Sequence, residues 1–260
     1  YKMKKENPKY IENKLTYAGL KKQEEFAWLK EVEAQPLSQV NMDLNKAYKN
    51  TFNSKFGFPK FKSKKYSKKS YRTAVGMKVN GRYFYVSKVG WVKMAEELRF
   101  KGKLMNVTIS QSKSGKYFAT FLVDSDNFQQ EPVANNIGLD LGLTHFCITS
   151  AGEKIDNNRF YRSLEQRLVR EQRKLSRRLE VAKKHNRKLD ECRNYQKQKV
   201  KVARIHEKIS NQRTDFLHKL SSKLTDENQI ICIEDLNVKG LVKNHKLAKS
   251  ISDVSWSEFV

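Results

Sequence analysis

Long apolar runs are missing from this 260-residue chain, and cysteine is scarce. No stretch reaches the roughly 18 apolar residues that a helix needs to cross a bilayer, which excludes a protein with membrane-spanning helices. No secretory apolar segment opens the chain. The three cysteines, Cys147, Cys192 and Cys232, form no Cys-x-x-Cys pair, so the sequence predicts neither a disulfide framework nor a zinc ribbon.

Acidic residues are also few beside the basic ones. Fifty-three Lys and Arg stand against 28 Asp and Glu, which gives a formal net charge of +25. A polyanion partner relieves such self-repulsion, and each cation set on a phosphate releases counterions, so we predict a nucleic-acid partner. A basic membrane-surface protein needs a broad apolar helix face or a lipidation signal, and we find neither. A soluble basic protein without a polyanion partner is the remaining alternative.

The hydrophobic fraction of 38% argues against wholesale disorder, and the length suffices for one or two cores. Residues 1–55 are predicted to be helical. Apolar residues recur at spacings of three and four between Leu37 and Phe52, Pro36 suits the first turn of that helix, and a shorter helix is expected over 23–30.

A basic segment with interleaved aromatic residues follows at 57–72. Such a segment suits a nucleic-acid backbone and its bases together, and a solvated linker is the alternative. The candidate nucleic-acid-binding residues in this segment are Lys60, Lys62, Lys64, Lys65, Lys68, Lys69, Tyr71 and Arg72.

Residues 71–124 are predicted to form short β-strands. Asn80-Gly81 between alternating apolar residues indicates a two-residue hairpin, and residues 113–115 join a second hairpin of 104–110 and 116–123. Short strands at this spacing suggest a small barrel. The polar stretch 125–135, which contains Pro132, is the expected domain boundary.

Two apolar segments beyond this boundary carry acids. Residues 136–150 are expected to form a buried strand that contains Asp140, with a turn at 150–153 and a returning strand toward Asn157. Residues 230–233 are nearly continuously apolar, which is typical of a strand covered on both faces, and Glu234 and Asp235 close it.

A carboxylate in a buried strand is costly unless it is paired or binds a cation. Two carboxylates side by side repel unless a metal lies between them, and Mg²⁺ with a few carboxylates leaves room for phosphate oxygens. Asp140 and Glu234 are therefore the candidate catalytic residues and Mg²⁺ ligands of two-metal phosphodiester hydrolysis. An acid at a strand end can instead be a turn residue or a helix cap, and the pattern does not choose between Glu234 and Asp235.

Residues 161–226 are predicted to form two long basic helices that fold back between Lys183 and Asn194. Leu164, Leu168, Leu175 and Leu179 share one helix face. The excess of one sign on the other faces indicates phosphate contacts, and a merely solvated face is the alternative. The candidate nucleic-acid-binding residues here are Arg170, Arg173, Lys174, Arg177, Arg178, Lys183, Lys184 and Arg187.

Five segments in order resemble TnpB, the transposon-associated ancestor of type V CRISPR effectors. They are WLKEVEAQPL (28–37), GFPKFKSKK (57–65), NIGLDLGLTHF (136–146), NQRTDFLHKLSSKL (211–224) and IICIEDLNVKGLVKNHKLAKSISDVSW (230–256). The resemblance spans nearly the whole chain and implies an RNA-guided DNA endonuclease in a prokaryotic cytoplasm, with guide RNA and target DNA as partners. A guide-RNA-dependent DNA-binding protein that does not cleave is the alternative function.

The resemblance implies a mixed α+β fold in three parts. A helical recognition-like segment covers 1–55, and a wedge-like or OB-like β-barrel covers 56–130. An incomplete RNase H-like RuvC domain covers 131–260, with a helical insertion at 161–226. Asp140 matches the first catalytic acid of the family and Glu234 the second.

Members of the family begin with a further strand and helix, and they continue into a four-cysteine zinc ribbon and a third catalytic aspartate. This sequence contains none of these, so we expect a chain truncated at both ends, without a zinc site, in which metal binding and cleavage are weak.

Overall fold

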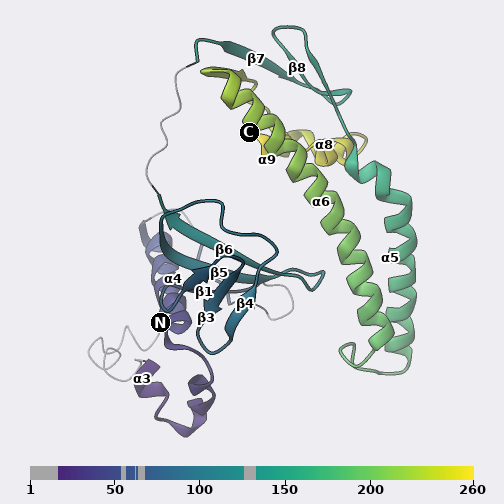
Figure 1. The fold of residues 1–260 in the computed structure, drawn as a ribbon. Helices are drawn as coiled ribbons and strands as arrows, with labels where there is room; N and C mark the ends of the chain where they lie inside the picture. The colour runs from purple at the N-terminus through teal and green to yellow at the C-terminus, as the bar shows by residue number, and fades with distance from the viewer. Residues whose placement is uncertain (1–16, 54–56, 62, 64–67, 126–132) are drawn as a thin grey trace. The chain divides into compact units, whose positions relative to one another are not determined.

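The computed structural model describes residues 17–53, 57–61, 63, 68–125 and 133–260 (Figure 1). Its contacts divide the chain into one unit within residues 1–128 and another within 129–260, and we describe each by itself. Among the described helices, none combines the length and apolar character needed to span a membrane. The division into three domains, at 1–55, 56–130 and 131–260, stays a prediction.

The described part of the first unit begins with helices, as predicted, and residues 1–16 and 54–55 of the predicted helical segment lie outside the described residues. The helices are α3 (Tyr17–Leu20), the 3-10 helix η1 (Glu24–Lys30) and α4 (Ala34–Asn53). Pro36 is buried in the first turn of α4, where its missing N–H costs no helical hydrogen bond. An ion pair of 2.7 Å between Arg72 Nη2 and Asp43 Oδ1 joins β1 to α4.

Six strands follow in two separate sheets. One sheet has the order β1-β5-β6, with β1 at Lys69–Thr73, β5 at Lys103–Gln111 and β6 at Tyr117–Asp124. The other has the order β2-β3-β4, with β2 at Lys78–Asn80, β3 at Tyr83–Val86 and β4 at Gly90–Lys93. Both predicted hairpins are confirmed. The β2–β3 turn residues are Gly81 and Arg82, since Asn80 itself pairs with Tyr83 and Gly81 adopts φ +54°.

The predicted small barrel does not close in the described part of the chain. Residues 94–102, between β4 and β5, form no strand, and no ladder of hydrogen bonds joins the two sheets. They contact through side chains instead, with the rings of Phe84 and Phe121 edge to face at 5.6 Å. The described strands therefore form two small sheets and no closed barrel, because closure requires a continuous ring of hydrogen-bonded neighbours, and the wedge-like or OB-like form stays a prediction.

Thr73 gives a test of packing in the first sheet. Its side chain is 2% exposed, and its Oγ1 has no hydrogen-bond partner in the described structure. A buried hydroxyl without a partner costs about 1–3 kcal/mol, and valine has the same shape and suits a strand. We expect Thr73→Val to raise the free energy of unfolding by about 1 kcal/mol in a urea titration. Thr120→Val, at an exposed position of β6, is the matched control and should change it little.

The second unit contains a four-stranded mixed sheet. Its strands are β7 (Asn136–Leu141), β8 (His145–Thr149), β9 (Lys154–Asp156) and β10 (Ile230–Ile233), in the order β10-β7-β8-β9. β10 pairs with β7 in parallel, while β7–β8 and β8–β9 are antiparallel. The single strand predicted over 136–150 was wrong, because the chain turns back after Leu141. At Gly142 a Cβ would lie 3.1 Å from the carbonyl oxygen of His145, so this tight turn favours glycine.

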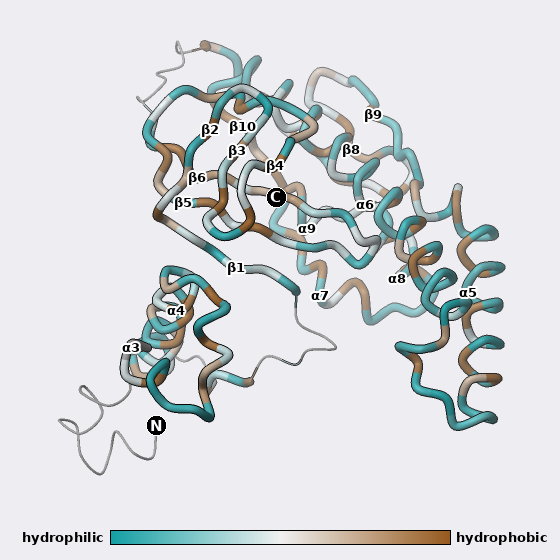
Figure 2. The backbone as a smooth tube through the Cα atoms, turned by 60° about the horizontal axis from the view of Figure 1, so that its bottom comes forward, coloured by the Kyte–Doolittle hydropathy of each residue, from teal (hydrophilic) through white to brown (hydrophobic). Residues whose placement is uncertain are grey.

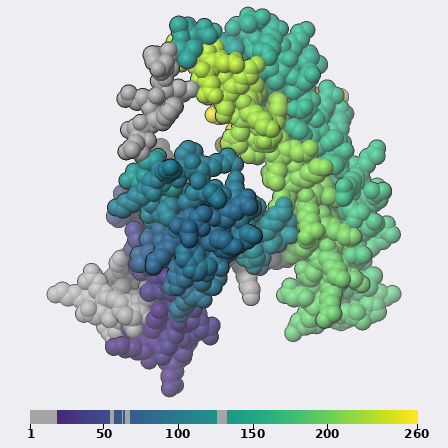
Figure 3. Space-filling view, viewed as in Figure 1, coloured from purple at the N-terminus to yellow at the C-terminus, as the bar shows by residue number. Residues whose placement is uncertain are grey.

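Two long helices follow β9 and form the predicted hairpin. They are α5 (Phe160–Lys184) and α6 (Arg193–Glu227), and three short helices close the described chain: α7 (Val238–Leu241), α8 (Ala248–Val254) and α9 (Trp256–Phe259). Leu168 packs with Val202, Ile205 and Ile209 between the two helices. Figure 2 shows the result in α5, where hydrophobic and hydrophilic residues alternate once per turn. In Figure 3 the atoms of α5 and α6 lie side by side.

The sheet of the second unit is covered on one face. Leu139 and Leu141 of β7 join a core with Leu217, Leu220 and Leu224 of α6, to which α8 and α9 contribute Ile251, Val254 and Trp256. The alternate residues of β10 point away from this core, and Ile230 remains 53% exposed. The expectation that 230–233 is covered on both faces was therefore wrong for the described chain, because the helices lie on one side only.

Candidate carboxylate site and nucleic-acid interface

Asp140 and Glu234 lie at the ends of neighbouring strands. The parallel register of β10 and β7 places Ile233 beside Leu139, and the next residues along the two strands are Glu234 and Asp140. Neighbouring strands run about 4.8 Å apart, so the two side chains start from adjacent backbone positions. Ninety-three residues of sequence separate them, and only strand pairing brings them together.

Both acids belong to the open face of the sheet. Asp140 is exposed between the buried residues Leu139 and Leu141, so its side chain points away from the core. Ile231 and Ile233 pack against the core, and Glu234 continues the opposite row of β10. Because successive side chains alternate between the two faces, Asp235 belongs to the opposite face from Glu234. It lies in a turn where Leu236 N donates to the Glu234 carbonyl at 3.0 Å. The geometry therefore pairs Asp140 with Glu234 rather than with Asp235.

Two exposed carboxylates on adjacent strand ends have the hard oxygen donors that Mg²⁺ takes. Two carboxylates that lie side by side repel each other, and a divalent cation between them relieves that repulsion. No cluster of three or more potential ligands from His, Cys, Asp and Glu occurs among the described residues. The described residues therefore offer these two carboxylates without a third side-chain ligand beside them.

The predicted basic residues of α5 are exposed and fall on different faces. Arg170, Arg173, Arg177 and Lys184 recur at helical spacing and form one stripe, which we call the α5 stripe. Lys183 lies outside this stripe. Arg187 follows the helix in the loop to α6.

Three of the candidates on α5 have partners within the hairpin, and the first is Arg170, whose Nε lies 4.0 Å from Glu171 Oε1. Arg178 Nη1 donates to the carbonyl oxygen of Asn194 at 2.6 Å, which ties α5 to the start of α6. Lys174 Nζ donates to Glu171 Oε1 at 3.0 Å. Arg178 therefore joins the two helices of the hairpin, whereas Lys174 is paired within α5.

The sequence reasoning missed a second row of cations on α6. Lys197, Lys201, Arg204 and Lys208 recur at spacings of three and four, and all are exposed. The pKa of the Glu171 carboxyl on α5 is lowered first by a hydrogen bond from Gln198, then by Lys174, and also by the charge of Lys201, so Lys201 of this row acts on α5. The spacing of these cations was visible in the sequence, but their place beside α5 was not.

The basic segment near β1 is described in part. Lys62, Lys64 and Lys65 lie outside the described residues, whereas Lys60, Lys68 and Lys69 are exposed. Arg72 pairs with Asp43 and so has a structural partner. Burial raises the pKa of the Tyr71 hydroxyl, and the charge of Glu33 adds to this.

Comparison with known proteins finds relatives that match most of the chain. A family model described as "Probable transposase" (OrfB_IS605) matches residues 120–245, which include both acids and the helical hairpin. The chain is 35% identical over 259 residues to a protein of Streptomyces pristinaespiralis named "Putative RNA-guided DNA endonuclease", covering 96% of this chain and 60% of that protein. The chain belongs to the TnpB family. A second relative, "Putative RNA-guided DNA endonuclease InsQ" of Escherichia coli K12, is 34% identical over 224 residues, or 85% of this chain and 52% of the relative.

This TnpB-family chain thus spans between half and two thirds of the length of these curated relatives. The segment 211–224, which carried part of the resemblance, lies on α6 where the helix crosses the sheet. Phe216, Leu217 and Leu220 serve the core, and Thr214 Oγ1 donates to Glu258 Oε1 at 3.0 Å. Much of this TnpB segment is therefore explained by packing.

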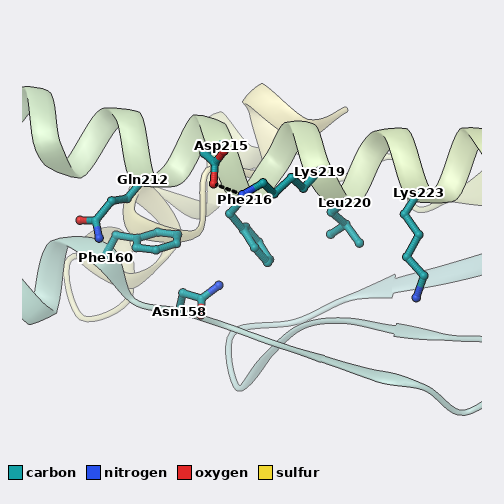
Figure 4. A pocket seen from close by; sticks show the side chains of 8 residues that line it. All are labelled: Asn158, Phe160, Gln212, Asp215, Phe216, Lys219, Leu220 and Lys223. Atoms are coloured by element: carbon teal, nitrogen blue, oxygen red, sulfur yellow. Dashed lines mark hydrogen bonds and ion pairs between the residues drawn. The ribbon is translucent and has the colours of Figure 1, made fainter.

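A hollow of about 440 Å³ also borders this segment (Figure 4). Phe216 and Leu220 point from α6 into the hollow, and the rings of Phe160 and Phe216 are 6.0 Å apart. At the rim, Lys219 Nζ is paired with Asp215 Oδ2 at 2.8 Å. The hollow contains none of the predicted site residues, so we assign it no role in catalysis.

The cysteines of this TnpB-family chain should differ in reactivity. Burial, and to a smaller extent the charge of Glu153, raises the pKa of the Cys147 thiol to about 11, whereas Cys232 is exposed on β10. We expect a maleimide at pH 8 to label Cys232 in the folded protein and Cys147 only after unfolding, as read by peptide mass spectrometry. The free energy of unfolding should fall between about pH 9 and 11, because the unfolded thiol ionises first. Rapid labelling of Cys147 in the folded chain would contradict this assignment.

Proposed function

We propose that this protein is an RNA-guided DNA endonuclease that hydrolyses phosphodiester bonds with Mg²⁺ held by Asp140 and Glu234. The parallel pairing of β10 with β7 is the observation that carries the proposal, because it sets two acids side by side on an open face. The mixed sheet with one parallel pair suits an RNase H-like RuvC core. The helices and small sheets of the first unit suit recognition and wedge-like parts.

In this proposal the chain's own groups hold the cation and orient the scissile phosphate. Asp140 is the penultimate residue of β7 and pairs with Ile148 of β8, so its backbone is held in the sheet. Glu234 begins the turn after β10 and approaches from one side. Mg²⁺ bound between them would supply charge neutralisation and activation of water.

The guide RNA and the target DNA are the proposed partners. A guide–target heteroduplex presents two phosphate backbones, and base pairing carries most of the sequence information while the protein contacts backbone and shape. The α5 stripe and the α6 row provide eight exposed cations on the hairpin for such a backbone. The candidates Lys60, Lys68 and Lys69 would add contacts from the first unit.

Charge reversal on the hairpin tests this interface. We expect Arg173→Glu with Arg177→Glu to weaken duplex binding about 10- to 100-fold and to lower the slope of log K against log salt by about 2. The matched control is Lys188→Glu with Lys199→Glu, which changes the net charge equally at exposed positions outside the α5 stripe and the α6 row. Equal losses in both double variants would show a general charge effect and remove the stripe from the interface.

A guide-RNA-dependent DNA-binding protein without cleavage is the second candidate function. It is favoured by one observation, that the described residues contain no cluster of three potential metal ligands. Two carboxylates hold a divalent cation less tightly than a fuller ligand set does.

Cleavage of a supercoiled plasmid decides between the two functions. The chain is incubated with the plasmid and the RNA encoded beside its own reading frame, with Mg²⁺ or with EDTA. Nicking or linearisation that needs both the RNA and Mg²⁺ supports the endonuclease. RNA-dependent retention of intact plasmid supports the binding protein, and neither retention nor cleavage overturns both.

A further inference from the structure

An apolar groove lies between the two sheets of the first unit. Its volume is about 660 Å³, and all of its lining residues fall within 71–123. This volume lies within the range of about 300–1,000 Å³ that small-ligand sites occupy. We call it the aromatic groove, because six of its lining residues are Tyr71, Phe84, Phe100, Tyr117, Phe118 and Phe121.

The floor of the aromatic groove is the β1-β5-β6 sheet. Register places Tyr71, Ile109 and Ala119 in one row across the three strands, and all three line the groove. Two residues along, on the same face, the next row contains Lys69 and Tyr117. A lysine therefore stands on the groove face of the sheet, one row from the Tyr71 ring.

The rim of the groove exposes large aromatic side chains to solvent. Phe100 and Tyr117 are each 71% exposed and Phe118 is 50% exposed, although all three line the cavity. The Phe84–Phe121 contact closes the interior. A core would bury such rings, whereas a stacking platform presents them.

The surroundings of the groove favour an anionic ligand. Residues 69–124 contain eleven Lys and Arg against three Asp and Glu. Lys93 lines the groove, and Lys68, which directly precedes β1, is exposed. Two acids, Glu96 and Glu97, also line the groove, and Glu96 is paired at 3.1 Å with Arg99, which lines it too.

We propose that the aromatic groove binds unpaired bases of a single-stranded nucleic acid, with its phosphates on the flanking lysines. Aromatic stacking accepts any base, because every base has a π-face, and the cations follow the backbone. Duplex bases are stacked on one another and do not enter. The inference rests on the proposed function to the extent that nucleic acid is the partner, and it adds a site that handles unpaired strand.

The test uses the full chain and a short single-stranded oligonucleotide with one 2-aminopurine, made as RNA and as DNA. We expect its fluorescence to change on binding, and the Phe100→Ala and Tyr117→Ala variants to bind it about 5- to 100-fold more weakly. Both residues are exposed at the rim, so their removal spares the core. Trp91→Ala is the matched control, because this exposed aromatic residue lies outside the groove lining. A fluorescence change with either the RNA or the DNA oligonucleotide supports the inference, and the one that binds more tightly identifies the kind of nucleic acid.

A duplex of the same sequence separates this inference from the proposed function. If the rim variants bind the single strand as the wild type does, while the Arg173/Arg177 reversal weakens duplex binding, the groove inference fails and the proposed function stands. An anilinonaphthalene dye that occupies the groove and is not displaced by the oligonucleotide would indicate an apolar protein partner instead, and would also overturn the inference. If the full chain binds no nucleic acid, both proposals fail.

Discussion

The Asp140→Asn variant is expected to leave a supercoiled target intact under conditions in which the wild-type chain cuts it. The substitution keeps the shape of the side chain and removes the negative charge beside Glu234. Substitution of residues that merely hydrogen-bond to a metal ligand lowers metal affinity or activity by about 10- to 100-fold. Loss of a ligand itself should therefore lower cleavage by more than about 100-fold. RNA-dependent retention of the plasmid should persist, because Asp140 lies on the sheet and not on the basic hairpin.

The neighbouring acids provide the control. We expect Glu234→Gln to lose cleavage as Asp140→Asn does, and Asp235→Asn to retain it. The strand register is the reason, since Glu234 continues the row that faces Asp140 and Asp235 does not. Equal nicking by the wild type and by Asp140→Asn would show that this carboxylate has no catalytic role.

Loss of Asp253 should have the largest effect on stability. Asp253 of α8 is buried, and its Oδ1 accepts from the backbone N–H of Tyr161 at 2.8 Å and from Arg213 Nη2 at 3.3 Å. Its Oδ2 accepts from the N–H of Arg162 at 3.3 Å. The Asp253 carboxylate therefore accepts hydrogen bonds from backbone N–H groups in the first turn of α5, where the N-cap residue Arg159 makes no side-chain cap hydrogen bond. The same carboxylate neutralises Arg213 of α6.

Removing one partner of a buried ion pair costs about 3–5 kcal/mol, because the other charge stays buried without compensation. We expect Asp253→Ala to lower the free energy of unfolding by about this amount in a urea titration. Asp215→Ala is the matched control, since this exposed acid pairs with Lys219 on the surface of α6 and such pairs contribute about 0.5 kcal/mol. A loss below about 1 kcal/mol for Asp253→Ala would show that water replaces the carboxylate at the helix start.

Local patterns predicted the elements of this protein well. The helical period of apolar residues indicated α5 and α6, and the fading of that period predicted their reversal near Lys183. Glycine in the segments 80–81 and 113–115 indicated the two hairpins, because turns with positive φ favour glycine.

The same patterns failed where the structure depends on contacts between residues that are far apart in the sequence. The apolar run 136–150 does not reveal the turn at Gly142, since a glycine within apolar residues also suits a continuous strand. The strands of 69–124 do not show whether they close into a barrel, because closure depends on hydrogen bonds between residues far apart. The apolar character of β10 did not reveal its open face, since burial depends on which helices pack against the sheet.

By itself the sequence determined the basic charge, the order of helices and strands, the family, and the two acids as candidates, because these depend on composition, on short-range periodicity and on ordered motifs. Only the tertiary structure decided that Glu234 rather than Asp235 lies in register with Asp140, that Arg178 and Arg72 hold structural contacts, and that exposed aromatic rings surround a groove. The physical reason is strand pairing and helix packing. They join residues that are distant in the chain, and no local pattern contains that information.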